Sequence, residues 1–165
     1  MKITLYTDGA SRGNPGPGGW GVYIEVIKDK LYTTNLSGGE KDTTNNKMEL
    51  IAAIESLKYL KKNISKILDN QEVKIKIKLD SKYVKHGITE WIKGWEKNNW
   101  KGSNRKEVAN KELWQELLKL KNIINEKLEE RGFKEISWEY VEGHAGIKGN
   151  EMADKLATEA ADKLK

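Results

Sequence analysis

Hydrophobic and polar residues alternate along five short stretches of this chain, and such alternation predicts β-strands. The stretches span residues 2 to 8, 20 to 27, 30 to 36, 73 to 79 and 136 to 141. In the fourth, VKIKIKL, every second residue is a lysine. We therefore expect a sheet with one packed face and one face that is at least partly wet.

Segments in which apolar residues recur with the helical period of 3.6 residues follow the third strand and separate the later strands. Helices are predicted at about 44 to 62, 81 to 96 (in short pieces), 107 to 130 and 148 to 163. The long helix carries an apolar stripe from Ala109 to Leu128. Short connections favour an antiparallel meander of strands 1 to 3, whereas helical crossovers call for parallel pairing of strands 1, 4 and 5. The pattern predicts an α/β fold with a mixed five-stranded sheet and flanking helices, as one domain over 1–165.

Residues 9 to 21 contain six of the fifteen glycines and both prolines. We expect a loop whose backbone is conformationally restricted at the prolines and is not covered by side chains at the glycines. Such a backbone can contact a ligand directly. The alternative is a tight connection between two strands. A dinucleotide-binding loop or P-loop is excluded, because the glycine spacing differs and a strand follows.

Composition limits the class of protein. At 165 residues and 37% hydrophobic content the chain can bury an ordinary core. No run approaches the roughly 18 apolar residues of a membrane span, and the first residues are predicted to form a strand rather than a signal peptide. We expect a cytoplasmic protein without a membrane partner. The absence of cysteine excludes disulfides, thiolate zinc sites and cysteine nucleophiles.

The excess positive charge lies in one segment, residues 82–106, which we call the handle. It contains seven Lys or Arg and two Glu, a net charge of +5, and the whole chain also has +5. Three of the six tryptophans lie there too. Basic residues interleaved with aromatic ones suit a nucleic acid. The alternative is a solvated amphipathic helix, with Trp91 and Trp95 on its packing face.

Four acidic residues stand in contexts that are unusual for surface charges. Asp8 and Asp80 each end a predicted strand, where ligand sites of α/β sheets lie. Glu49 and Asp154 lie in helical stretches beside small residues, which let a helix approach a sheet closely. Hard carboxylate oxygens are the ligands of Mg²⁺. A metal site is therefore predicted.

Five motifs together resemble a bacterial ribonuclease H of type 1 and cover nearly the whole chain. They are TDG…GNPGPGGWG, TTNNKMEL, LDSKYV, GITEWI followed by the handle, and GHAG…NEMADKLA. The resemblance implies the ribonuclease H fold and a monomer. It implies endonucleolytic hydrolysis of the RNA strand of RNA–DNA hybrids, which leaves 5′-phosphate and 3′-hydroxyl ends. It also implies two Mg²⁺ ions, for which Mn²⁺ can substitute, about 3.5–4 Å apart.

The resemblance assigns a role to each candidate catalytic residue. Asp8 bridges both ions, Asp154 holds the ion that activates water, and Glu49 and Asp80 hold the ion facing the leaving oxygen. His144 shuttles protons or helps a metal and product to leave. The alternative for His144 is a turn histidine bonded to nearby backbone.

Substrate contacts are also predicted, from the resemblance and from charge. They are Asn14, Thr44, Asn45, Asn46, Lys82, Trp91, Lys93, Lys97, Lys101 and Trp114. Amides of the three asparagines suit minor-groove edges and 2′-hydroxyls. Thr44 is expected at a DNA-strand phosphate, with Trp91 and Trp114 along the DNA-strand channel.

Two positions depart from the family pattern. Lys82 stands where glutamine is common, which turns a base-edge contact into a phosphate contact, and Glu142 adds negative charge before Gly-His. Two alternatives to the hybrid nuclease stay open. One is another carboxylate-dependent nuclease of the same fold, and the other is a non-catalytic hybrid-binding protein.

Overall fold

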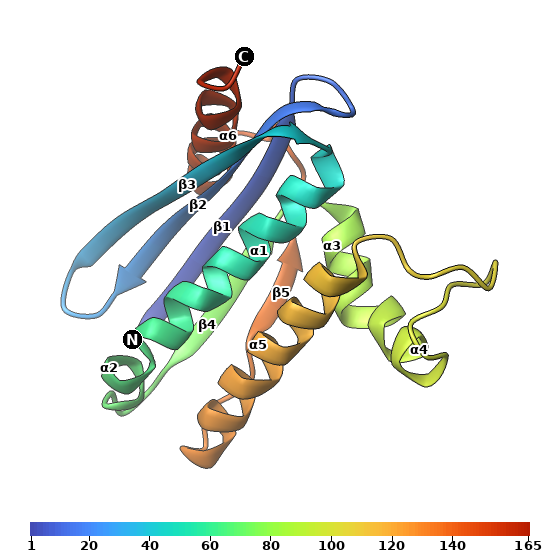
Figure 1. The fold of residues 1–165 in the computed structure, drawn as a ribbon. Coiled ribbons are helices and arrows are strands. Elements are labelled where there is room, and N and C mark those ends of the chain that lie inside the picture. Colours follow the sequence, from blue (N-terminus) through green and yellow to red (C-terminus); the bar gives the residue numbers. More distant parts are fainter.

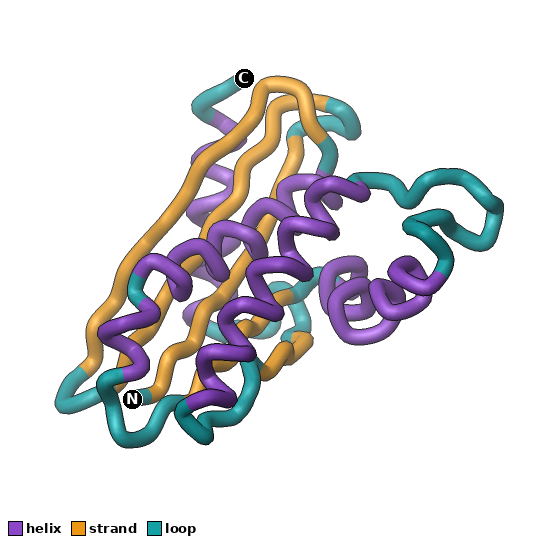
Figure 2. Tube along the Cα trace, turned by 60° about the horizontal axis from the view of Figure 1, so that its bottom comes forward, coloured by secondary structure: helices purple, strands orange, loops and turns teal.

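Five strands form one mixed sheet in the order β3-β2-β1-β4-β5 (Figures 1 and 2). They are β1 (Lys2–Ser11), β2 (Gly16–Ile27), β3 (Leu31–Thr43), β4 (Lys74–Leu79) and β5 (Ser137–Tyr140). β2 pairs antiparallel with both β1 and β3, and β4 pairs parallel with both β1 and β5. This computed structural model, which describes residues 1–165, confirms the predicted strand directions and α/β class.

Helices cover both faces of the sheet. They are α1 (Asn45–Lys62), α2 (Ile64–Leu68), α3 (Lys82–His86), the π-helical turn η1 (Gly87–Trp91), α4 (Ile92–Lys97), α5 (Lys111–Glu130) and α6 (Lys148–Asp162). α1 and α5 lie together on one face, and α6 lies behind β1, β2 and β3 on the other (Figure 1). The main core of 24 buried residues lies between the sheet and α1 and α5. Every helix is too short or too polar to cross a lipid bilayer.

Several boundaries differ from those predicted. The stretch predicted as short helices at 81–96 is divided into α3, η1 and α4, and the short helix α2 was not predicted. The long helix begins at Lys111 rather than near 107, because Glu107 forms an isolated β-bridge with Lys101 and residues 109–110 form a turn. Ala109 is therefore exposed and does not belong to the apolar stripe of α5.

The prediction of a ligand-contacting glycine loop at 9–21 was wrong for most of its glycines. β1 continues to Ser11 and β2 begins at Gly16, so only a short hairpin connects them. A Cβ atom at Gly9 would collide with the backbone at Glu49 in α1, and one at Gly21 would collide with the backbone at Ala153 in α6. These glycines let a helix lie against each face of the sheet.

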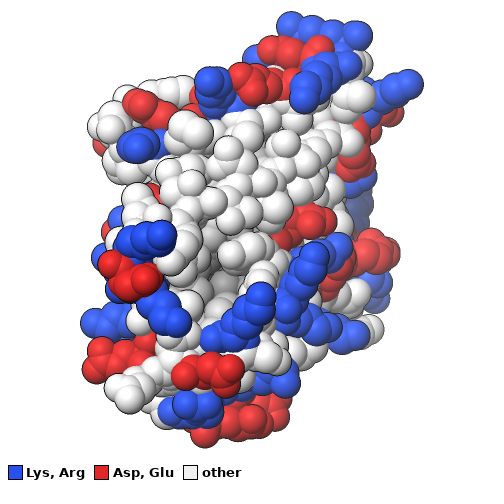
Figure 3. Space-filling view, turned by 90° about the vertical axis from the view of Figure 1, so that its left-hand side faces the viewer, with Lys and Arg blue, Asp and Glu red and all other residues white.

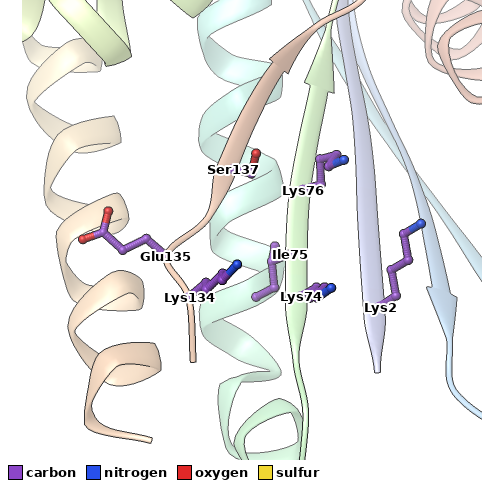
Figure 4. A pocket seen from close by; sticks show the side chains of 7 residues that line it. All are labelled: Lys2, Lys74, Ile75, Lys76, Lys134, Glu135 and Ser137. Carbon is purple, nitrogen blue, oxygen red and sulfur yellow. The ribbon is translucent and has the colours of Figure 1, made fainter. Parts of the chain in front are cut away.

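On the sheet face that carries α6, no helix covers β4 and β5, and the lysines of β4 face solvent there, as their alternation predicted. A cavity of about 330 Å³ lies there (Figure 4). It is lined by Lys2, Lys74, Ile75, Lys76, Lys134, Glu135 and Ser137. Lys2 and Lys74 begin their strands, whereas Asp8 and Asp80 lie near the other ends. The cavity is thus remote from the predicted metal site.

Candidate active site

Strand register brings the first two carboxylates together. In the parallel pair β1 and β4, Thr7 lies opposite Leu79, and Asp8 and Asp80 are the next residues along each chain. Asp8 is 7% exposed. The pKa of Asp8 is raised to about 9, mainly by burial and also by the negative charges of Asp80 and Asp154. Burial also raises the pKa of Asp80. Neighbouring carboxyl groups thus lie where little water can solvate their negative charge.

Helix α1 positions the third carboxylate, Glu49. The hydroxyl of Thr44 caps the helix by accepting a hydrogen bond from the amide of Lys47 (3.2 Å). Glu49 accepts hydrogen bonds from Asn45 Nδ2 (3.0 Å) and from Ser81 Oγ (2.6 Å). Burial raises the pKa of Glu49, and the hydrogen bond from Ser81 opposes that shift. The carboxylate is therefore held in one orientation.

Helix α6 supplies the fourth carboxylate, Asp154, which is half-buried. Ala153 and Ala157 are fully buried beside it, so the helix lies directly on the sheet. Asn150, one turn earlier, is 3% exposed, and its side chain counteracts the rise in the pKa of Asp80. The amide oxygen of Asn150 has no hydrogen-bond partner in the protein.

The four carboxylates lack cationic partners, because no lysine, arginine or histidine forms an ion pair with any of them. The side chains of the protein alone do not form a cluster in which three acidic or histidine residues could bind one metal ion. Carboxylates without cationic partners fit Mg²⁺, which prefers oxygen ligands and completes its coordination with water and substrate phosphate. The unpaired oxygen of Asn150 also fits a hard cation nearby.

His144 lies in the exposed turn between β5 and α6. Its φ angle is 58°, and its ring forms no hydrogen bond with the protein, so the alternative of a backbone-bonded histidine does not apply. The preceding Gly143 touches the site, since a Cβ atom there would lie 3.0 Å from Asp80 Oδ2. The turn that carries His144 thus passes beside Asp80 at Gly143.

Four predicted substrate residues line one cavity of about 400 Å³ beside the carboxylates. The lining residues are Asn14, Thr44, Asn45, Asn46, Tyr83, Ala109 and Asn110. Asn14 Oδ1 accepts a hydrogen bond from the amide of Asn45 (3.3 Å), which joins the β1–β2 hairpin to α1. The cavity is therefore rich in amide groups and contains no charged side chain.

Sequence reasoning missed four residues of this region: Ser81, Tyr83, Asn110 and Asn150. Ser81 could have been found, because a serine that follows a strand and precedes a helix is a common N-cap, and its hydroxyl accepts from Val84 N at 3.1 Å. The others carry no local signal, since they meet the site only through tertiary packing.

The structure contradicts the expected role of Trp114. This residue is fully buried, so its ring does not line a channel. Its Nε1 donates a hydrogen bond to the hydroxyl of Tyr83 (3.1 Å), and the two rings lie 5.2 Å apart. Trp114 therefore supports Tyr83 from below. Trp91 is 41% exposed and lies 6.1 Å from Tyr83, so it extends the surface beyond the cavity.

The handle projects from the body beside the start of α5 (Figure 1). Its Trp95 and Trp100 are half-buried and pack against the core. The alternative of a helical packing face therefore holds for Trp95 but not for the exposed Trp91. None of its seven basic residues forms an ion pair. Lys93, Lys97 and Lys101 are exposed. The handle thus combines two half-buried tryptophans and one exposed tryptophan with unpaired surface lysines.

Lys82, one of the two departures, also lies on the surface. Its ammonium group stands 5.6 Å from the centre of the Tyr140 ring. Because Lys82 is the second residue after Asp80, its side chain brings positive charge close to the site without pairing with a carboxylate there. Glu142, the other departure, is exposed.

The strand order and the acids at the ends of β1 and β4 define the class, an α/β protein with the ribonuclease H fold. The model of the RNase H family matches residues 1–162, and this chain belongs to that family. A Ribonuclease H of Ruthia magnifica subsp. Calyptogena magnifica is 46% identical over 163 residues, which cover 99% of this chain and 97% of that protein. The predicted family and fold are confirmed.

Two solved structures extend the comparison. LC9-RNase H1, described as a type 1 RNase H with the type 2 active-site motif, superposes with a TM-score of 0.79 at 28% identity, over 99% of this chain and 74% of its own. LC11-RNase H1 in complex with an RNA/DNA hybrid gives a TM-score of 0.66 at 28% identity, over 98% and 97%.

Proposed function

We propose that this protein is an endoribonuclease that hydrolyses the RNA strand of RNA–DNA hybrids and leaves 5′-phosphate and 3′-hydroxyl ends. The observation that carries the proposal is the buried Asp8 beside Asp80, without a basic partner, together with an amide-lined cavity whose Asn45 donates a hydrogen bond to Glu49. Family membership supports it, as does the hybrid bound to LC11-RNase H1.

The carboxylates are proposed to hold two Mg²⁺ ions, with Mn²⁺ as a substitute. When bound, these ions supply an activated water and positive charge at the reacting phosphate. Asp8 would help to hold both ions, Asp154 would hold the ion that supplies the activated water, and Glu49 and Asp80 would hold the ion that supplies positive charge at the leaving oxygen. Ser81 and Asn45 orient Glu49 through the hydrogen bonds described above.

His144 is proposed to move protons between the site and solvent. Its ring is exposed and makes no competing hydrogen bond with the protein, so it is free to accept a proton and release it to water. A proton carrier of this kind assists the reaction without holding the metal.

The amide-lined cavity is proposed to distinguish RNA from DNA. Asn45 uses its amide nitrogen on Glu49, which leaves its carbonyl oxygen to accept a hydrogen bond from a 2′-hydroxyl. Asn14 and Asn46 read the neighbouring minor-groove edge. Thr44 binds a phosphate of the DNA strand, along which the exposed Trp91 lies.

Phosphate contacts outside the cavity are assigned to lysines. Lys82 approaches from beside the site, and Lys93, Lys97 and Lys101 bind farther along the DNA strand. All proposed contacts come from one chain, so residues 1–165 act as one catalytic domain and a monomer suffices for cleavage. The bacterial relatives support the cytoplasm as the place of action.

A cleavage assay tests the proposal and separates it from its alternatives. Labelled RNA–DNA hybrid, duplex DNA and duplex RNA are incubated with the protein, with Mg²⁺ or with a chelator. We expect cleavage of the RNA strand of the hybrid only, and only with Mg²⁺. Preferred cleavage of duplex DNA would favour another carboxylate nuclease, and hybrid binding without cleavage would favour a binding protein.

A further inference from the structure

The cavity at the beginning of β1 and β4 gathers positive charge that no carboxylate neutralises (Figure 4). Lys2, Lys74 and Lys134 line it, and none of the three forms an ion pair. They come from three segments of the chain, namely β1, β4 and the residues before β5. These side chains therefore meet only in the folded protein. We call this site the lysine cavity.

Carboxylates close to the lysine cavity have other surroundings. Figure 4 shows the side chain of Glu135 pointing away from the lysines toward α5, where it raises the pKa of Glu129. Glu139 pairs with Lys76 (3.2 Å), the fourth lysine of the lining. Glu25 lies in the same cross-strand row as Lys76, two strands away. The other three lysines therefore remain available to an anion.

Strand register sets two of these charges opposite each other. Lys2 of β1 faces Lys74 of β4 in the parallel ladder. Neighbouring strands lie only about 4.7–4.9 Å apart. Like charges that face each other across a ladder destabilise the pair. An anion bound between the two ammonium groups would remove this repulsion.

The lining indicates which kind of anion the lysine cavity suits. Besides its charged side chains it offers the hydroxyl of Ser137 and one apolar side chain, Ile75, but no aromatic ring. Sites for small organic ligands are mostly apolar and aromatic, and a nucleotide base needs such a surface. Ammonium groups and a hydroxyl suit a phosphate group by itself. We therefore expect recognition of phosphate without recognition of a base.

A row of lysines extends from the lysine cavity toward the proposed catalytic carboxylates. Lys74, Lys76 and Lys78 alternate along β4 on the open face, and Asp80 is the next residue of the same parity. Residues two apart on a strand are separated by about 6.6–6.8 Å, which is close to the distance between successive phosphates of an extended nucleic-acid strand. Lys74 lies about 20 Å from Asp80 along this line. The row thus matches the charge pattern of one strand.

Lysines are not distributed in this way over the whole sheet. Figure 3 views the molecule from the β3 side and shows a broad uncharged surface with charges at its margins. In β3 itself, residues 31–39 contain no charge. The lysine row of β4 is therefore a local feature and not part of a general basic coat.

We propose that the lysine cavity and the β4 row bind the phosphate backbone of a single strand of nucleic acid. Lys2, Lys74 and Lys134 contact adjacent phosphates, and Ser137 donates a hydrogen bond to one of them. Contacts to the backbone alone carry no sequence information, so DNA and RNA strands bind alike. The choice of a nucleic acid over a small phosphate compound rests on the row toward Asp80, and therefore on the proposed function.

Anisotropy of labelled oligothymidylate tests the proposal, with chelator present so that cleavage plays no part. The cavity variant, in which Lys2, Lys74 and Lys134 are replaced by Ala, should bind about 10-fold or more weakly at low salt. Each phosphate contact with a single strand contributes about 0.7 to the slope of log K against log salt, so the slope should fall by about 2. This result does not depend on whether the protein cleaves hybrids.

Two further variants separate the lysine cavity from general charge effects. Replacing the exposed Lys61, Lys62 and Lys66 by Ala removes the same charge elsewhere and should keep the parental slope. Lys74→Glu sets opposite charges face to face with Lys2, so it should weaken binding of the oligomer without lowering the melting temperature. Unchanged melting shows that the loss of binding does not come from unfolding.

The position and the source of the phosphate are tested by two additional measurements. In heteronuclear NMR spectra, oligothymidylate should shift the amide signals of residues 74–76 and 134–137. Inorganic triphosphate, a small phosphate compound, should displace the oligomer only in large excess, because it cannot follow the lysine row.

Three results would overturn the proposal. The first is a cavity variant whose salt slope equals that of the parent. The second is a set of amide shifts confined to the handle, which would place the strand there. The third is displacement by triphosphate at the same phosphate concentration as the oligomer, which would assign the lysine cavity to a small phosphate compound.

Discussion

Asp8 is the residue on which the proposed chemistry depends most. It is the most buried of the four carboxylates, and two further carboxylates raise its pKa. Its neighbours leave the charge without a protein partner, so a divalent ion is its natural complement. Replacing Asp8 by asparagine keeps the size of the side chain and removes its negative charge.

Asp8→Asn should therefore abolish cleavage while hybrid binding is retained, because the binding residues lie in the cavity and the handle. The measurements are single-turnover cleavage with Mg²⁺ and hybrid affinity by fluorescence anisotropy. A variant that still cleaves at a rate near that of the parent would exclude the two-ion assignment.

The same side chain predicts how stability depends on pH in the absence of metal. The pKa of Asp8 is raised from 3.8 to about 9 in the folded protein, so the folded state holds a proton that the unfolded state releases between these values. Stability should fall as pH rises through that window. Asp8→Asn should flatten this fall and raise the melting temperature near pH 8 by at least about 2 °C.

Thermal unfolding in chelator between about pH 5 and pH 9 measures this effect. Asp69→Asn, at the exposed carboxylate after α2, is the control and should keep the slope of the parent. Equal slopes for Asp8→Asn and the parent would show that Asp8 is ionised in the metal-free protein.

His144 is expected to assist catalysis rather than to hold the metal. His144→Ala should slow cleavage by roughly 10²–10⁴-fold at most, as for loss of a proton-transfer group. Metal binding, followed by calorimetry, should match that of the parent. Complete loss of Mg²⁺ binding would instead identify His144 as a ligand.

At the scale of elements, the site depends on how closely α1 lies against β1. The backbone of α1 passes Gly9 so closely that a Cβ atom there would overlap it at Glu49. Gly9→Ala should cost about 1–3 kcal/mol by overpacking and should also displace Glu49, so cleavage falls as well.

Gly94 in α4 provides the matched control, because a Cβ atom there would meet nothing within 4 Å. Gly94→Ala should be neutral or stabilise by up to about 1 kcal/mol, since alanine favours helix more than glycine does. Urea unfolding compares the two variants. Equal effects would show that α1 can shift away from β1 at little cost.

The elements themselves were largely predictable, and the contacts between them were not. Alternation identifies a strand wherever one face is buried, so all five strands could be placed from sequence. The glycines at 9 and 21 gave a false signal of a loop, because a strand that a helix approaches closely also needs glycine. Trp114 was assigned to a surface, because helical spacing does not tell which of several tryptophans lies deepest.

The candidate site shows the same division. Its four carboxylates could be found because each interrupts an otherwise apolar or small-residue pattern. The network around Glu49 could not, because Asn45 and Ser81 belong to segments far apart in the chain and meet only after folding. Which lysines remain unpaired also depends on tertiary positions.

At the scale of the whole molecule, the excess positive charge lies apart from the proposed catalytic carboxylates. The exposed lysines of the handle lie apart from the carboxylates, so affinity and turnover can be changed independently. Replacing Lys93, Lys97 and Lys101 by Ala should weaken hybrid binding and flatten its salt dependence, since each neutralised phosphate contributes about 0.7–0.9 to the slope of log K against log salt.

A salt titration of hybrid affinity measures this prediction, together with cleavage rates at saturating hybrid, which should fall less than affinity. Replacing the exposed Lys61, Lys62 and Lys66, at the end of α1 and in α2, is the control with the same loss of charge. An unchanged slope for the handle variant would mean that its lysines only face solvent.

The four carboxylates are distributed along nearly the whole chain, from β1 to α6, and this has a consequence for the order of synthesis. A ribosome delivers Asp8 long before Asp154, so a growing chain holds the ends of β1 and β4 before the fourth carboxylate emerges. Nuclease activity then begins only when α6 docks on a sheet that is already formed. A nascent chain that has not yet folded α6 onto the sheet should therefore lack nuclease activity.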